Sequence, residues 1–80
     1  MARGKFEYTT DKADNAVRKA GPRYVRAIQN IQSIGKVAND SQCQMPEEKI
    51  DKIERTLYEE VERTVAGLRA GAYAVAVAGL

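Results

Sequence analysis

Two stretches that each begin beside a proline decide the fold: residues 21–39, GPRYVRAIQNIQSIGKVAN, and residues 45–70, MPEEKIDKIERTLYEEVERTVAGLRA. In both, apolar side chains recur every three or four residues, the spacing of a seam along an amphipathic helix. The seam positions are Tyr24, Ile28, Ile31, Gly35 and Ala38 in the first stretch and Ile50, Ile53, Leu57, Val61, Thr64 or Val65, and Leu68 in the second. A short polar loop joins them, so the sequence predicts an antiparallel hairpin of helices over residues 22–38 and 46–70.

A separate short helix is expected before the hairpin, over residues 11–20. Thr10 or Asp11 can supply its N-cap. Gly21 and Pro22 are expected to end it, because a proline fits the first turn of a new helix, where its missing N–H would have no partner.

Gly35 has two interpretations. It can let a partner backbone approach closely, or it can end the helix. We favour close approach, because Val37 and Ala38 continue the apolar periodicity. The helix over residues 46–70 should end near Gly67 or Gly71.

The two ends of the chain are expected to lie outside the helices. Within the arm of residues 1–10, residues 5–10 alternate polar and apolar side chains, which suits an extended arm or a short strand, and the arm could dock Phe6 and Tyr8 on a helix. Residues 71–80 form an apolar tail whose alternating alanines and valines suit a strand as well as a helix. A minor β pairing of arm with tail is left open.

The expected architecture is all-α, within a single small domain of residues 1–80. A core of this size is marginal. The chain has one cysteine and no histidine, which excludes an internal disulfide and a zinc site. This composition therefore favours stabilisation of the fold by a homo-oligomer or by docking on another protein.

Charge is unevenly distributed along the chain. Residues 1–40 hold eight basic and four acidic side chains, whereas residues 41–80 hold five and seven. Four basic residues follow helical spacing across the Gly21-Pro22 dipeptide, Lys12, Lys19, Arg23 and Arg26, with Arg18 flanking them and Tyr24 beside them. The candidate residues for binding a protein partner or a nucleic acid are Arg18, Lys19, Arg23, Tyr24 and Arg26. The alternative is an ordinary soluble surface, with some of the arginines paired to acids on the last helix.

Catalytic chemistry is not expected. Without histidine, neither the serines nor Cys43 has a recognisable base. Gly35-Lys36 lacks the glycine that a phosphate-binding loop needs five residues earlier, where Asn30 stands. The acids of residues 47–62 alternate with basic residues as a solvated face does, so no metal, no cofactor and no enzyme activity are predicted.

Residues 26–39, RAIQNIQSIGKVAN, contain the pattern Ile-Gly-x-hydrophobic-small-Asn, which also occurs in one group of small proteins. With the acidic helix start at residues 47–53, the chain resembles small uncharacterised helical proteins of phages and mobile elements. The loop at residues 41–44, SQCQ, departs from the aromatic stretch of that group. The resemblance implies a compact accessory protein in a host cytosol and carries over no functional residue.

The function that these observations favour is a non-enzymatic protein-protein interaction module, such as an inhibitor or modulator of a host complex. The residues expected to form its oligomer or partner seam are Ile28, Ile31, Gly35, Leu57 and Val61. The alternatives are a small nucleic-acid-binding accessory protein and a structural subunit of a larger assembly. The longest uncharged run, eleven residues, is too short to span a bilayer, so a cytoplasmic location is expected.

Overall fold

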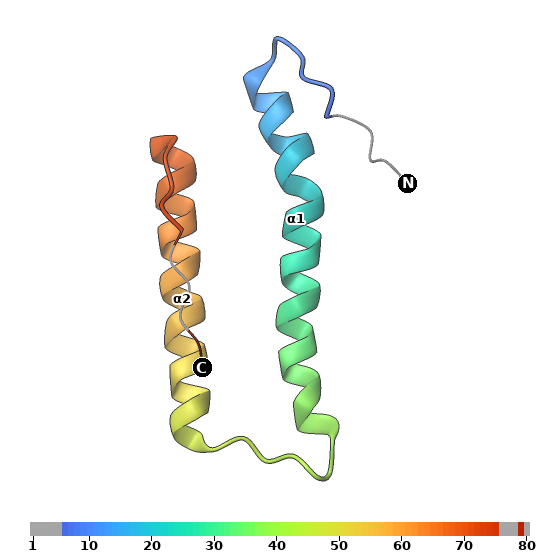
Figure 1. Cartoon of the computed structure of the whole chain (residues 1–80), viewed down its shortest axis with the longest axis vertical. Helices are drawn as coiled ribbons and strands as arrows, with labels where there is room; N and C mark the ends of the chain where they lie inside the picture. Colours follow the sequence, from blue (N-terminus) through green and yellow to red (C-terminus); the bar gives the residue numbers. More distant parts are fainter. Residues whose placement is uncertain (1–5, 76–78, 80) are drawn as a thin grey trace. The chain divides into compact units, whose positions relative to one another are not determined.

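The computed structural model describes residues 6–75 and Gly79. It comprises two compact units, Met1–Ser41 and Gln42–Leu80, and each is described by itself. The elements in chain order are α1 (Lys12–Gly35), the 3-10 helix η1 (Lys36–Asn39) and α2 (Glu47–Ala70) (Figure 1). The described residues form helices and no strand, so the all-α prediction is confirmed.

α1 is one continuous helix where the sequence predicted two. It passes through Gly21 and Pro22, so the predicted break at this dipeptide is wrong. A proline disfavours helical geometry in the preceding residue because its ring clashes with that residue's backbone and Cβ. Gly21 has no Cβ, which reduces this clash, and the apolar periodicity stays in phase across the dipeptide. Pro22 still leaves the carbonyl of Arg18 without its helical N–H partner.

The start of α1 is fixed by Asp11, one of the two predicted caps. Its Oδ1 accepts from the backbone N–H groups of Ala13 at 3.0 Å and Asp14 at 3.2 Å. These N–H groups have no partner within the helix, so the cap stabilises this end by about 1 kcal/mol.

α2 has the boundaries that its local sequence predicts. Pro46 stands at the N-cap, and its carbonyl accepts from Lys49 and Ile50. The helix ends at Ala70 and is capped by Gly71, which adopts φ 77°, a left-handed conformation that glycine reaches without a Cβ penalty.

Beyond Gly71 the chain turns back, and residues 72–75 lie beside α2 (Figure 1). Lys52, in the N-terminal part of α2, donates through Nζ to the carbonyl of Gly79 at 3.1 Å, although the two residues are 27 positions apart in the sequence. Residues 72–75 are neither helix nor strand, and neither are residues 6–9 of the arm. The minor β pairing that the sequence leaves open therefore has no strand among the described residues of the arm or of the tail; the rest of the tail, residues 76–78 and 80, lies outside them.

Neither unit encloses a core. No described residue is buried. Ile28, Ile31 and Ile34 on α1 keep 39%, 42% and 43% of their surface exposed, and Leu68 on α2 keeps 72%. Apolar burial is the main term that offsets the conformational entropy of folding. The apolar faces of these two helices are therefore available to pack against another apolar surface.

Candidate functional site

The N-terminal arm folds back onto the first turns of α1. Its base is held by a reciprocal pair of hydrogen bonds: the Thr9 N–H donates to Asn15 Oδ1 and Asn15 Nδ2 donates to the Thr9 carbonyl, each at 2.8 Å. Farther along the arm, Arg18 donates to the carbonyl of Glu7. Arg18 also pairs with Asp14 at 2.9 Å.

Two aromatic rings of the arm contact the basic residues of α1. The Arg18 guanidinium lies 4.7 Å from the ring centroid of Phe6, and Lys19 Nζ lies 4.9 Å from that of Tyr8. Lys19 Nζ also donates to the Tyr8 hydroxyl at 2.5 Å. The interpretation in which the arm docks these aromatic residues on a helix is confirmed. Arg18 and Lys19 are thus already in contact with the arm.

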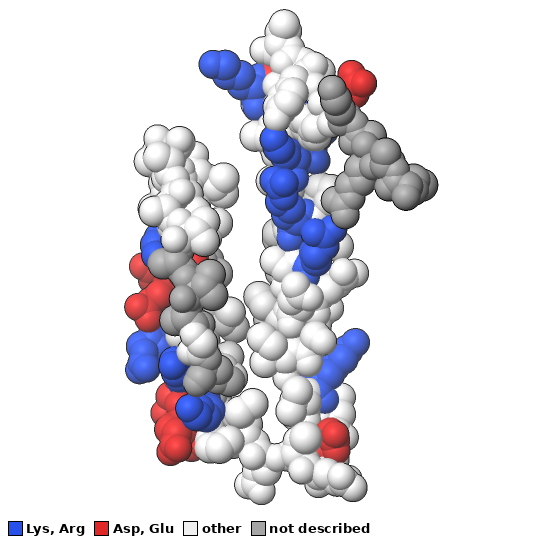
Figure 2. Space-filling view, in the orientation of Figure 1, with Lys and Arg blue, Asp and Glu red and all other residues white. Residues whose placement is uncertain are grey.

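The continuity of α1 aligns four basic residues, which we call the basic stripe: Lys12, Lys19, Arg23 and Arg26. Their spacings of seven, four and three residues place them on one side of a single helix. Figure 2 shows basic side chains gathered along the N-terminal half of α1, whereas basic and acidic side chains are mixed on α2. Arg18 lies outside this stripe.

The apolar face of α1 is a second, separate surface. Ile28 and Ile31 lie on it, with the exposed Tyr24 on the same side nearer the N-terminus. A Cβ built at Gly35 meets nothing within 4 Å. Gly35 is the last residue of α1, and the close approach of a partner backbone at this position stays a prediction.

On α2, the predicted seam residues Leu57 and Val61 lie on one face of the helix. Leu57 is half-buried and Val61 is exposed. They belong to the second unit, whereas Ile28, Ile31 and Gly35 belong to the first.

The returning tail is anchored through Tyr73. Its hydroxyl donates to Glu60 Oε2 at 2.8 Å, and the Arg63 guanidinium lies 5.4 Å from its ring centroid. Arg63 in turn pairs with Glu60, three residues earlier in α2. A hydrogen bond with Tyr73 raises the pKa of Arg63 above its ordinary value, and the charge of Glu60 acts in the same direction.

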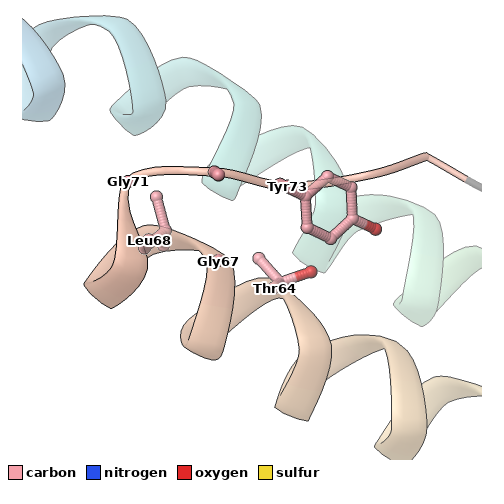
Figure 3. Close-up of a pocket in the computed structure, with 6 residues that line it drawn as sticks. Thr64, Gly67, Leu68, Gly71 and Tyr73 are labelled. Atoms are coloured by element: carbon pink, nitrogen blue, oxygen red, sulfur yellow. The ribbon is translucent and has the colours of Figure 1, made fainter.

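Gly67 lets the tail come this close. A Cβ at this position would lie 2.9 Å from the Tyr73 Cβ and 3.1 Å from the carbonyl oxygen of Ala72. Between the helix end and the tail lies a hollow of about 530 Å³ (Figure 3). It is lined by Thr64, Gly67, Leu68, Gly71, Ala72 and Tyr73. This lining contains no acid, base or activated nucleophile, so the hollow is not an active-site candidate.

Other chemistry is sparse in the part of the chain that the structure describes. No three histidine, cysteine, aspartate or glutamate side chains gather there as metal ligands would. Cys43 is exposed. None of the helices found in residues 6–75 has the length and apolar character of a membrane span.

The contacts of Asn15 and Tyr73 were not anticipated from the sequence. Each joins a helix to a segment outside it, so helical periodicity gives no sign of it. The sequence contains one indication of the contact between Tyr73 and α2. Gly67 and Gly71 leave one side of the last helical turn without side chains.

Comparison of the chain with protein-family models, with curated proteins and with solved structures finds no match.

Proposed function

We propose that the protein is a non-enzymatic interaction module that assembles with a second copy of itself. The observation that carries the proposal is the absence of any buried residue among those described, although apolar side chains follow heptad spacing on both helices. In this proposal, α1 and α2 pair as an antiparallel hairpin, and two hairpins bury their apolar faces in a four-helix bundle.

The charges of the two helices support this partner. α1 contains five basic side chains and one acid, whereas α2 contains seven acids and five basic side chains. Two α1 helices side by side would repel each other, while α1 beside α2 is attractive. Both helices have 24 residues, or about 36 Å. A second copy therefore supplies a partner helix of matching length and opposite charge.

The matched variants Ile31→Glu and Asn30→Glu test the proposal. Both place one carboxylate on α1, the first on the apolar face and the second on the polar side of the helix. The native protein should have a solution mass of twice the 8.8 kDa chain. Its melting temperature should rise with protein concentration, because assembly stabilises only the folded state. A carboxylate in the buried face costs several kcal/mol, so Ile31→Glu should be monomeric and less helical.

Asn30→Glu should retain the native mass and melting temperature. Light scattering after size-exclusion chromatography gives the mass, and circular dichroism gives the helix content. A native chain that melts cooperatively as a monomer, independently of its concentration, would exclude self-assembly. Equal effects of the two variants would show that the apolar face is not the interface.

A further inference from the structure

The basic stripe is straight and long because α1 does not break at Gly21. From Lys12 to Arg26 it extends over fourteen residues, which is about 21 Å along the helix axis. Two shorter helices joined at a bend would have separated its two halves. The continuous helix instead forms one linear array of four positive groups.

The positive charge of the stripe is not neutralised locally. Within the described residues of this unit, Lys12, Arg23 and Arg26 make no ion pair or hydrogen bond through their side chains. Asp14 is the sole acid of α1, and it is paired with Arg18. Lys19 donates to the Tyr8 hydroxyl and to no carboxylate among the described residues of this unit.

Apolar side chains also lie within the stretch of α1 that carries the stripe. Val17, Tyr24 and Val25 are each more than half exposed there, whereas the isoleucines begin at Ile28, after the last charge of the helix. A helix that binds an anionic membrane surface has basic and bulky apolar groups along the same stretch. A membrane surface is therefore tested beside the ligand inferred below.

We infer that the basic stripe binds the phosphate backbone of a nucleic acid. Nucleic acids present closely and regularly spaced negative charges along a line, which a linear array of lysine and arginine can follow. Tyr8 lies at the edge of the stripe with 65% of its surface exposed. Exposed aromatic rings beside basic groups are typical of proteins that bind single strands, so single strands should bind at least as tightly as duplexes.

This binding does not use the apolar face that the proposed self-assembly would bury. The stripe lies to one side of the apolar face of α1, so its side chains stay accessible when that face is covered. A protein that fails to dimerise can therefore still bind nucleic acid, and the reverse also holds.

Two double variants with equal loss of charge test the inference. Arg23→Gln with Arg26→Gln removes two charges from the stripe. Lys36→Gln with Arg55→Gln removes two exposed basic residues elsewhere. Binding of fluorescently labelled single-stranded and double-stranded oligonucleotides is followed by anisotropy from about 50 to 200 mM salt, the range over which phosphate contacts are strongly screened.

Four phosphate contacts predict a slope of log affinity against log salt of roughly −3 for single strands, or about a 50-fold loss over that range. The stripe variant should bind more weakly and reduce the slope by about 1.4, because two contacts are lost. The control should keep the native slope. Circular dichroism and solution mass, measured on all three proteins, check that fold and assembly are unchanged.

Absence of binding at the lower salt, or equal losses in both double variants, would overturn the inference. Anionic lipid vesicles form a parallel arm of the experiment. Binding to vesicles but to neither oligonucleotide would assign the stripe to a membrane surface instead.

Discussion

Pro22→Ala should stabilise α1 more than any other single substitution in the helix. Proline inside a helix is about 3 kcal/mol less favourable than alanine, because it lacks an N–H and its ring crowds the preceding turn. Alanine would restore the hydrogen bond to the Arg18 carbonyl. We expect higher helix content by circular dichroism and a higher free energy of unfolding, by up to about 3 kcal/mol.

Pro46→Ala is the matched control, because Pro46 is the other proline of the chain and stands at the N-cap of α2. An N–H at this position has no helical partner, so its absence costs little. We expect no measurable change in helix content. If Pro22→Ala also had no effect, the chain would break at this dipeptide in solution, and the basic stripe would fall into two parts.

The helix boundaries that the sequence predicts correctly depend on local chemistry. Asp11 needs only the first turn of α1 to act as a cap, and Gly71 needs only its own left-handed conformation to end α2. The dipeptide Gly21-Pro22 is different, because the two residues act in opposite directions. Proline alone favours a break in the helix, but the missing Cβ of Gly21 makes helical geometry accessible. A rule that treats each residue separately cannot compare these two opposing effects.

The basic stripe and the apolar face of α1 could be predicted from the sequence to a similar extent as these helix boundaries. The spacing of Arg23 and Arg26 and of Ile28 and Ile31 is a property of the sequence, so their placement on helix sides follows from periodicity. The contact of Tyr73 with α2 depends on residues six to thirteen positions apart meeting across a turn. No periodic pattern encodes such a contact, and it becomes visible only when the chain is folded.

Gly67→Ala should release the tail from α2, whereas Gly35→Ala should leave every contact intact. Both replace a helical glycine, and alanine is more favourable there by about 0.5–1 kcal/mol. At Gly35 the new methyl group meets open space, so the unfolding free energy should rise by that amount. At Gly67 it would lie 2.9 Å from the Tyr73 Cβ, so the tail must move.

Release of the tail removes the hydrogen bond between Tyr73 and Glu60, and an exposed bond of this kind is worth about 1 kcal/mol. This loss offsets the gain in helix propensity, so Gly67→Ala should have nearly native stability. Nuclear Overhauser contacts between the Tyr73 ring and α2 should disappear in Gly67→Ala and persist in Gly35→Ala. If both variants kept these contacts and gained equal stability, the tail would not depend on the bare helix surface at Gly67.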